Sequence, residues 1–437
     1  MPVLLSGIQS KMNFSFEAAK TDPSGARCGR WMTPHGAIET PAFMPVGTQA
    51  TVKGLTQEAL EELGAGIILA NTYHLYLRPG HELVRRLGGL HRFMSWPRAI
   101  LTDSGGYQVF SLSKLRKITE EGVRFRSHLD GSEHLLTPEK AAEIQLALGS
   151  DIAMVLDECI ETPAPRERAE AALKRTTEWA RRARLYFEEC TRRNGNLSQW
   201  QFGIVQGATF ADLRRESARQ LLDLDFPGYA VGGLAVGEPQ EMTCEMTAEV
   251  TALLPKGRPR YLMGVGRPEQ LADYVALGID MMDCVLPTRA ARHACLYTSA
   301  GRVLIKNARY AQDQLPIDPH CSCSVCRRYS RAYLRHLFTA GELTGAVLAT
   351  HHNVHFYLDI MRQIREAIEF GNLANFSSRT SCSAWAVRGA PRAVKVVAIP
   401  GSAARPRYGV FIFPECSRGV GFIRVAGKEK HFLETKN

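Results

Sequence analysis

A carboxylate at the end of an apolar run is the first candidate for chemistry in this sequence. The run ends in Asp283, and Pro287 follows it, with Arg289 and Arg292 three positions apart. Apolar runs bounded by turn residues are typical of buried strands, and burying an unpaired charge is costly. Asp283 is therefore either satisfied by backbone amides or used in a reaction, and this stretch alone favours neither.

Other apolar runs along the chain end in a similar way. Their ends carry Asp103, Asp157, Gln206 and Gly233. Three acids facing one pocket would suit acid/base or nucleophilic chemistry at carbon or phosphorus. The strand ends offer no nearby histidine to support a cage for a catalytic metal ion. Sugar chemistry therefore fits better, with one carboxylate attacking an anomeric carbon while another transfers protons.

A second group of reactive side chains is the crowded motif formed by Cys321, Cys323 and Cys326. Eleven cysteines in 437 residues are too few for a disulfide framework, and this crowding is typical of metal ligands in a reducing compartment. Three thiolates and one further ligand predict a closed, structural zinc site without an open position for catalysis. The candidates for the fourth ligand stand at the start of the next expected helix: His351, His352 and His355.

The composition sets the class of protein. With 437 residues, 45% of them hydrophobic and 22% charged, the chain is long enough for a barrel-sized domain with an appendage. Its net charge of +10 favours a polyanionic partner such as a nucleic acid. No apolar run is long enough to span a membrane, and the opening residues lack a secretory signal. We therefore expect a cytoplasmic protein, with residues 1–12 as an N-terminal extension.

About eight apolar runs alternate with helices over residues 40–290. This order predicts a (β/α)8 TIM barrel, an α/β fold in which the carboxyl-terminal strand ends carry the chemistry. Periodicity alone does not exclude a doubly wound sheet. The expected strands are residues 40–46, 67–70, 99–102, 152–156, 202–205, 228–231, 260–263 and the run that ends at Asp283. The expected helices between them are residues 56–63, 81–87, 137–148, 166–190, 211–222, 241–253 and 268–276.

Several segments lie outside this alternation. Residues 123–136 alternate as a hairpin with Asp130 and Gly131 at its turn, which predicts an insertion in the barrel. Beyond the barrel we expect helices over residues 329–338 and 351–369, whereas residues 14–29 show only a weak pattern. From residue 377 the composition shifts to Ser, Arg, Gly and Pro, and we expect residues 377–437 to be a loose, disordered tail.

Five motifs, together with the cysteine cluster, closely resemble the tRNA-guanine transglycosylase family. They are residues 103–110 (DSGGYQVF), 203–207 (GIVQG), 232–238 (GGLAVGE), 260–266 (RYLMGVG) and 283–289 (DCVLPTR). The resemblance covers residues 13–376. It implies a TIM barrel with a small zinc-binding subdomain over about 307–360, inserted near the carboxyl-terminal end of the barrel. It further implies a homodimer that exchanges guanine 34 in the GUN anticodon of tRNA for a 7-deazaguanine, on the path to queuosine.

The resemblance also implies a role for each matching residue. Asp283 would be the nucleophile on the ribose C1′ of nucleotide 34, and Asp103 the general acid/base. Arg289 and Arg292 would grip the anticodon loop. The residues implied to bind the base are Asp157, Gln206, Gly233, Ser104, Tyr107, Gln108, Cys159, Leu234, Val236 and Met263. Such a double displacement passes through a covalent enzyme–tRNA intermediate and requires no redox or energy cofactor.

The same comparison selects among the histidines, because the ligand of the family directly precedes an asparagine, as His352 precedes Asn353 here. It implies that one structural Zn²⁺ per subunit is bound by Cys321, Cys323, Cys326 and His352. In the bacterial type, valine stands at the position of Val236 and cysteine at that of Cys159. A valine narrows the pocket beside the 7-substituent, so we expect the small base 7-aminomethyl-7-deazaguanine (preQ1).

Alternatives remain at this stage. The chain could insert queuine or an archaeal-type base, or it could be a non-catalytic tRNA-binding subunit, which would lack one of the two catalytic acids. An ordinary glycoside hydrolase would explain the acids but not the cysteine motif. Individual residues also have plainer interpretations: Tyr107 and Met263 as core, residues 232–233 as a tight turn, and Arg289 and Arg292 as a solvated helix face.

Overall fold

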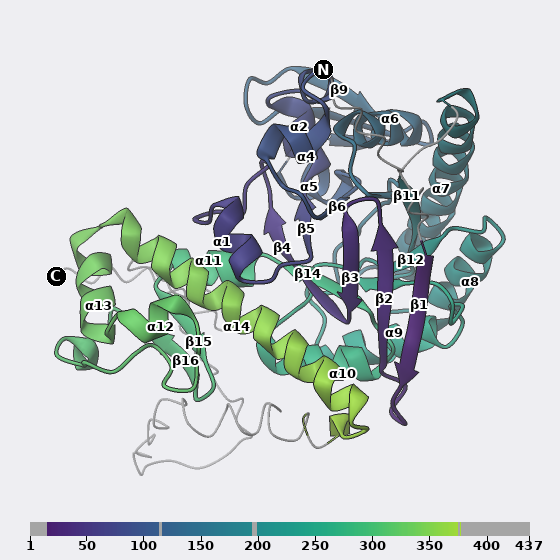
Figure 1. Ribbon diagram of the computed structural model, residues 1–437. Coiled ribbons are helices and arrows are strands. Elements are labelled where there is room, and N and C mark those ends of the chain that lie inside the picture. Colours follow the sequence, from purple (N-terminus) through teal and green to yellow (C-terminus); the bar gives the residue numbers. More distant parts are fainter. Residues whose placement is uncertain (1–14, 113–115, 195–198, 375, 377–437) are drawn as a thin grey trace, which may run out of the picture. The chain divides into compact units, whose positions relative to one another are not determined.

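The structure is a computed structural model, and it describes residues 15–112, 116–194, 199–374 and 376 (Figure 1). Eight parallel strands close into a barrel in the order β10-β11-β12-β13-β14-β4-β5-β6. They are β4 (Ala42–Gly47), β5 (Ile67–Ala70), β6 (Ala99–Thr102), β10 (Ile152–Met154), β11 (Trp200–Val205), β12 (Gly228–Val231), β13 (Arg260–Leu262) and β14 (Met281–Cys284). The TIM barrel is confirmed, and the doubly wound sheet is excluded.

The barrel strands form where they do because their sequences are mostly apolar, with single polar residues such as Gln201, Arg260 and Asp283. In β4, β5, β6 and β14 every residue is buried. Strands covered by helices outside and by packed side chains inside show continuous apolar runs of this kind. The barrel closes where β14 pairs in parallel with β4, from Met281 opposite Ala42 to Cys284 opposite Pro45.

Helices surround the barrel. They are α1 (Gln57–Glu62), α2 (Thr72–Leu77), α3 (His81–Arg86), α4 (Gly89–Met94), α5 (Gly106–Leu112), α6 (Pro138–Leu148), α7 (Arg166–Asn194), α8 (Ala211–Leu222), α9 (Gln240–Thr251), α10 (Leu271–Ala276) and α11 (Leu286–Arg292). The side chain of Thr56 caps α1 by accepting from the amide of Ala59, as its position predicted. None of the described helices combines the length and the apolarity needed to cross a lipid bilayer.

An antiparallel sheet that the sequence did not predict lies before the barrel: β1 (Ser15–Thr21), β2 (Arg27–Thr33) and β3 (Gly36–Thr40). Its pattern was weak because β1 is almost wholly exposed. The expected strand over residues 40–46 is consequently two elements, since Thr40 ends β3. Trp31 of β2 packs on Trp200 and Phe202 of β11, with ring centroids 5.3 and 5.4 Å apart.

A second antiparallel sheet comprises β7 (Arg116–Ile118), β8 (Val123–Arg126) and β9 (Glu133–Leu136), between α5 and α6. The hairpin predicted over residues 123–136 is confirmed as β8 and β9, and Gly131 lies in its turn with a φ of 75°. The third strand, β7, was not anticipated. The predicted extension, residues 1–12, and the predicted tail, residues 377–437, lie outside the described residues.

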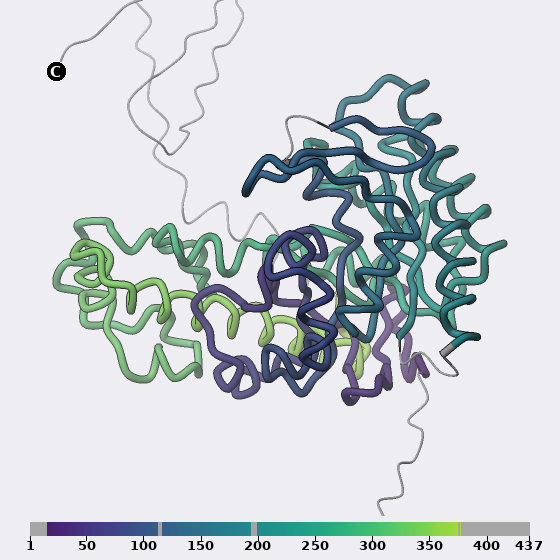
Figure 2. Tube along the Cα trace, turned by 90° about the horizontal axis from the view of Figure 1, so that it is seen from above, coloured from purple at the N-terminus to yellow at the C-terminus, as the bar shows by residue number. Residues whose placement is uncertain are grey.

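Beyond the barrel the chain forms a hairpin, β15 (Cys295–Thr298) and β16 (Gly301–Leu304), and three helices, α12 (Ser324–Arg328), α13 (Arg331–Ala340) and α14 (Leu343–Glu369). The expectation that the last helix begins at His351 is wrong, because α14 begins at Leu343. Gly345 lies inside α14, where the helix passes close to α13: a Cβ at this position would lie 3.1 Å from the Cβ of Leu337. Both views show α14 returning from the cysteine segment to the barrel, where it contacts β4 and β2 (Figures 1 and 2).

A buried ion pair joins the first sheet to the barrel. Arg27 of β2 is 4% exposed and Asp280, just before β14, is 0% exposed. Their side chains form two hydrogen bonds, Nε to Oδ1 at 3.0 Å and Nη2 to Oδ2 at 2.5 Å. Asp280 also accepts from the backbone N–H of Arg260 at 2.7 Å.

We predict that Asp280→Ala lowers the free energy of unfolding by about 3–5 kcal/mol, because it leaves the Arg27 guanidinium buried without its partner. Urea denaturation followed by circular dichroism measures this. Glu39→Ala is the matched control, since it removes an ion pair to Arg30 in which both side chains are more than half exposed, and it should change stability by about 1 kcal/mol or less. Equal losses in the two variants would show that the buried pair is not an anchor.

Candidate active site

The three predicted acids meet at the carboxyl-terminal end of the barrel, around one cavity of about 570 Å³. Asp103 follows β6, Asp157 follows β10 and Asp283 lies in β14, and each is 8% exposed. Nine further predicted residues line the cavity: Ser104, Tyr107, Gln108, Cys159, Gly233, Leu234, Val236, Met263 and Arg289. Two predicted residues do not line the cavity. The side-chain amide of Gln206 donates a hydrogen bond to Asp157, and Arg292 is exposed on α11.

Asp283 is held through one of its two carboxylate oxygens. Oδ1 accepts from the hydroxyl of Tyr261 at 2.5 Å and from the amide of Gly264 at 2.8 Å. Burial raises the pKa of Asp283, and these two hydrogen bonds lower it. No residue in the described part of the chain donates to Oδ2, so this oxygen remains available at the cavity.

Asp103 is held through both oxygens. Oδ2 accepts from the side-chain amides of Asn71 at 2.5 Å and Gln108 at 2.8 Å, and Oδ1 accepts from the backbone N–H of Thr72 at 2.8 Å. Burial, with a smaller contribution from the charge of Asp283, raises the pKa of Asp103 to about 6 against the opposing effect of these donors. A carboxyl group with this pKa can both donate and accept a proton near neutral pH.

Asp157 has both oxygens fixed as well. Oδ1 accepts from the hydroxyl of Ser104 at 3.1 Å, and Oδ2 accepts from the side-chain amide of Gln206 at 2.7 Å. Burial raises the pKa of Asp157, and the same two donors lower it. The chain must approach closely here, because a Cβ on Gly106, where α5 begins, would lie 2.7 Å from the Asp157 carbonyl oxygen.

Two glycines form the wall of the cavity at the end of β12. A Cβ on Gly232 would come within 2.6 Å of Ile204, and one on Gly233 within 2.1 Å of the side-chain oxygen of Gln206. Gly233 also has a φ of 64°, which an L side chain rarely adopts. The pair is thus a tight turn, as one interpretation held, and it is also part of the cavity wall. These two descriptions are compatible.

The loop after these glycines is organised by Glu238, which the site prediction left out. Its carboxylate accepts from the backbone amides of Ala235, at 2.5 Å, and Val236, at 3.1 Å. The hydroxyl of Thr243, in α9, donates to the same carboxylate at 2.8 Å. Glu238 therefore fixes the backbone that carries the Val236 side chain at the cavity.

Tyr107, Met263 and Arg289 have different degrees of exposure at the cavity. Tyr107, on α5, is 52% exposed, so its interpretation as a core residue is wrong. Met263 is partly buried and packs against the barrel core while it lines the cavity, which combines both interpretations. Arg289 is exposed on α11, the short helix that follows Asp283.

Sequence reasoning identified Ser104, Gln108 and Gln206 but missed the other groups that hold the acids. Asn71 and Thr72 follow β5, and their polarity after an apolar run was a usable signal. Tyr261 carried no signal, because a tyrosine inside a buried strand looks like any other core residue. His74 also lines the cavity, so the expectation of no histidine near the acids is wrong.

Arg214 is a further residue that the prediction missed. It is fully buried in α8 and donates to the carbonyl oxygens of Ala208 at 2.7 Å and Gly232 at 2.9 Å. A signal existed, because Arg214 is spaced three and four residues from Ser217 and Ala218, which are buried on the inner face of α8. A charged residue on that face needs internal partners.

The cysteine motif forms a compact group with one histidine. The ligand atoms of Cys321, Cys323, Cys326 and His352 lie within 4.8 Å of one another. Nδ1 of His352 is 3.7, 3.6 and 3.3 Å from the three sulfurs in that order. Ligand bonds of about 2.3 Å to sulfur and 2.0 Å to nitrogen around a tetrahedral ion would separate S and N by about 3.6 Å. The donor set therefore fits a metal ion.

The other two candidate histidines do not complete this group. Nε2 of His351 lies 3.0 Å from the hydroxyl of Ser324, and His355 approaches one sulfur, that of Cys321, at 3.5 Å. His352 instead directs Nε2 to the carbonyl oxygen of Tyr297 at 2.7 Å, which leaves Nδ1 toward the sulfurs.

Asn353 connects the metal-ligating group to the barrel. Its side-chain oxygen accepts from the amide of Tyr297 at 3.0 Å, and its side-chain nitrogen donates to the carbonyls of Pro287 and Cys295, both at 3.1 Å. Pro287 belongs to α11, directly after β14. The adjacent residues His352 and Asn353 thus belong to the cysteine–histidine group and bind the segment that follows β14, respectively.

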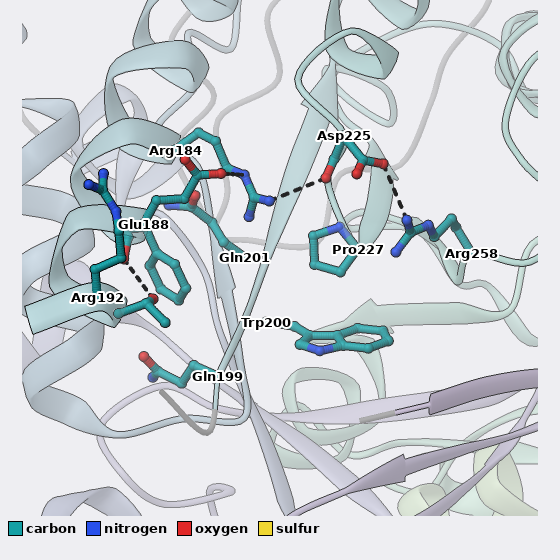
Figure 3. A pocket seen from close by; sticks show the side chains of 11 residues that line it. Arg184, Glu188, Arg192, Gln199, Trp200, Gln201, Asp225, Pro227 and Arg258 are labelled. Atoms are coloured by element: carbon teal, nitrogen blue, oxygen red, sulfur yellow. Dashed lines mark hydrogen bonds and ion pairs between the residues drawn. The ribbon is translucent and has the colours of Figure 1, made fainter. Parts of the chain in front are cut away.

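A further cavity, of about 620 Å³, lies away from the acids (Figure 3). It is lined by Trp200 at the start of β11, by Pro227 before β12 and by Arg258 before β13. These are the amino-terminal ends of the strands. Arg258 forms an ion pair with Asp225 at 3.2 Å there. In TIM barrels that end contributes to stability, whereas chemistry occurs at the opposite end.

The sequence is similar to named relatives over most of its length. The queuine tRNA-ribosyltransferase of Koribacter versatilis is 58% identical over 366 residues, covering 82% of this chain and 95% of the relative. The protein of that name from Solibacter usitatus is 59% identical over 364 residues, or 83% and 96% of the two chains. That from Pelotomaculum thermopropionicum is 57% identical over 357 residues, or 82% and 95%.

A family model agrees with these relatives. The model described as queuine tRNA-ribosyltransferase matches residues 22–384 of this chain. The match includes the whole barrel, the acids at its carboxyl-terminal end and the group formed by the three cysteines and His352. The chain therefore belongs to the queuine tRNA-ribosyltransferase family.

Proposed function

We propose that this chain is a tRNA-guanine transglycosylase that replaces guanine 34 of GUN anticodons through a covalent enzyme–tRNA intermediate. The observation that carries the proposal is the difference between two buried carboxylates at one cavity. Asp283 presents one oxygen to which no described residue donates a hydrogen bond, whereas Asp103 has both oxygens hydrogen-bonded and a pKa raised to about 6. The first suits a nucleophile, and the second suits a proton carrier.

In the first half of the reaction, Oδ2 of Asp283 attacks C1′ of nucleotide 34 while the bond from C1′ to N9 of guanine breaks. Asp103 donates a proton to the departing guanine. In the second half, Asp103 takes a proton from the incoming base, whose N9 attacks C1′ and releases Asp283. The two displacements together retain the configuration at C1′.

The base would be recognised by the fixed carboxylate and by the glycine wall. Asp157, held by Ser104 and Gln206, is oriented to accept from the N1–H and the exocyclic amine of a guanine edge. The amide of Gly233 would donate to the purine carbonyl. Tyr107, with half its surface free, would cover one face of the ring and Met263 the other.

The tRNA would approach from the side of α11. Arg289 and Arg292 are both exposed on this helix, and Arg289 reaches the cavity that Asp283 lines. A stacked base is out of reach of a buried carboxylate, so nucleotide 34 must turn out of the anticodon loop into the cavity. The resemblance also implies a homodimer, which is part of the proposal.

We further propose preQ1 as the incoming base. Val236 lines the cavity, and Glu238 fixes the backbone that carries it, so the wall cannot easily retreat from a bulky 7-substituent. Queuine, with its cyclopentenediol, is the second candidate. A non-catalytic tRNA-binding subunit is disfavoured because both carboxylates are present at one cavity.

The first test is incorporation of radiolabelled guanine into unmodified tRNA bearing a GUN anticodon. We expect label to enter the tRNA with the wild type, and Asp283→Ala to reduce the rate by roughly 10³-fold or more. Unlabelled preQ1 should then chase the label out, whereas queuine should not. Asp225→Ala, which alters an exposed acid far from the active-site cavity, is the matched control and should keep the wild-type rate.

The outcomes separate the alternatives. A folded, metal-loaded wild type without incorporation would contradict the transglycosylase and leave a tRNA-binding relative. Incorporation by Asp283→Ala would remove Asp283 from the reaction. A chase by queuine as efficient as that by preQ1 would contradict only the choice of base.

The pH dependence should report Asp103. Its raised pKa of about 6 means that the protonated form needed to release guanine becomes scarcer as pH rises through 6. We expect kcat/KM for tRNA to fall about tenfold per pH unit above this pKa. Asp103→Asn should be much slower and should lack this decline. A wild-type profile that stays flat between pH 6 and 8 would contradict the assignment of Asp103 as the acid.

We also propose that the metal ion is a structural zinc bound by Cys321, Cys323, Cys326 and His352. Zinc would fix the chain between β16 and α14, and its four protein ligands leave no position for chemistry. We expect one zinc per chain by mass spectrometry, and its loss in Cys323→Ser with a Tm lowered by roughly 5 °C or more. Cys244→Ser, in α9, is the control and should retain the metal. Full zinc content in Cys323→Ser would contradict this ligand set.

A further inference from the structure

Arg214 is a buried cation whose partners are backbone carbonyl groups. Its side chain is completely buried, and none of the ion pairs found among the described residues includes it. Nε donates to the carbonyl of Ala208 at 2.7 Å, Nη1 to that of Gly232 at 2.9 Å, and Nη2 to that of Gly233 at 3.3 Å. Burial lowers the pKa of Arg214 to about 10, which leaves the group charged at neutral pH.

These contacts determine where the adjacent amide groups point. In a trans peptide the C=O and N–H bonds are antiparallel, and the cis bonds of the described chain lie elsewhere, before Pro41, Pro79 and Pro163. With the carbonyls of Gly232 and Gly233 turned toward Arg214, the N–H groups of Gly233 and Leu234 must point to the opposite side.

That opposite side is the active-site cavity. Gly232, Gly233 and Leu234 line it, whereas Arg214 does not. Within the described residues, neither the amide of Gly233 nor that of Leu234 donates to any acceptor. Two consecutive N–H groups therefore face the cavity without a partner, although buried amides are normally paired.

We infer that Arg214 is a positioning residue for the base: its guanidinium holds two peptide groups so that the amides of Gly233 and Leu234 donate to the carbonyl oxygen of the bound purine. The inference rests on the proposed function and names a residue that touches no substrate. The cation behind the peptides also polarises them, which strengthens the two donors on the cavity side.

The site is built for an arginine. The planar guanidinium reaches four carbonyls at once, those of Ala208, Gly232 and Gly233 and, at 3.5 Å, that of Val205, which the point charge of a lysine cannot do. A glycine at position 207 leaves space for the arginine. A Cβ on Gly207 would come within 2.7 Å of the Arg214 amide nitrogen and 2.9 Å of its Cγ. A lysine at this position would retain the charge and lose the fixed geometry.

The test compares Arg214→Lys with Arg215→Lys. Arg215 is the next residue of α8, partly exposed and paired with Glu249, so its replacement is the matched control. We expect Arg214→Lys to raise the KM for guanine roughly tenfold, as for the loss of a hydrogen bond to a ligand. The KM for tRNA should stay within about twofold, and the control should match the wild type for both substrates.

Base discrimination adds a readout that a purely structural role would not change. 2,6-Diaminopurine carries an amine where guanine has its carbonyl, so the wild type should prefer guanine. In Arg214→Lys the ratio of kcat/KM for guanine to kcat/KM for 2,6-diaminopurine should fall roughly tenfold, like the affinity for guanine. Calorimetry measures guanine binding directly, and thermal unfolding shows whether each variant is folded. If Arg214→Lys does not fold, Arg214→Gln takes its place in the same measurements.

The results distinguish the two proposals. A wild type that neither binds nor exchanges guanine would overturn the proposed function together with this inference. A wild type that exchanges guanine, with unchanged guanine affinity and discrimination in Arg214→Lys, would overturn the inference alone. An equal rise in the KM for guanine and for tRNA, with a lower Tm, would show a merely structural arginine and would also overturn it.

Discussion

The candidate active site depends on three carboxylates that are buried away from water. Asp103, Asp157 and Asp283 each have only 8% of their surface exposed, and burial is the largest influence on the pKa of all three. Carboxylates placed side by side in a nonpolar surrounding would take up protons and lose their distinct roles. The barrel prevents this because it supplies each acid with a different set of hydrogen-bond donors.

Most of these donors belong to or follow a neighbouring strand; the exception is Gln108 of α5, which follows the same strand as Asp103. Asp103 follows β6 and is held by residues that follow β5, while Asp157 follows β10 and is held by Gln206 after β11. Asp283, in β14, is held by Tyr261 of β13 and by Gly264 just beyond it. Each of these strand pairs is adjacent in the barrel. Parallel pairing in register is therefore what converts three similar acids into three different chemical groups.

The sequence predicted the parts of the structure that depend on continuous apolar runs. The barrel strands and the acids at their ends follow from such runs, because a polar residue after a buried strand is conspicuous. The first sheet was not predictable, since the exposed strand β1 carries no apolar period, and α14 was predicted too short because its first residues, from Leu343, were not assigned to the helix. Gly345 permits close helix packing, and only the tertiary structure shows that.

The site prediction had a similar limit. The residues that face the cavity stood in recognisable motifs, and the structure brings nearly all of them to one cavity. The groups behind them, Tyr261 and Arg214 among them, resemble ordinary core and helix residues in the sequence. Their importance comes from the acceptors they meet, and those acceptors belong to segments far apart in the chain. The spacing of residues within α8 indicates that Arg214 lies on its buried face, but spacing within one element does not identify the acceptors that such a residue meets.

The closure of the barrel by β4 and β14 has a consequence for synthesis of the protein. The two strands pair directly, although Met281 is translated about 240 residues after its partner Ala42. At about 5–20 residues per second this separates them by roughly 12–48 seconds. Helix α14, which covers β4, emerges later still. Throughout that interval an entirely apolar strand has an unpaired edge, the kind of surface on which chains associate wrongly. A growing chain of this protein therefore cannot pair this edge of β4 until β14 has been synthesised.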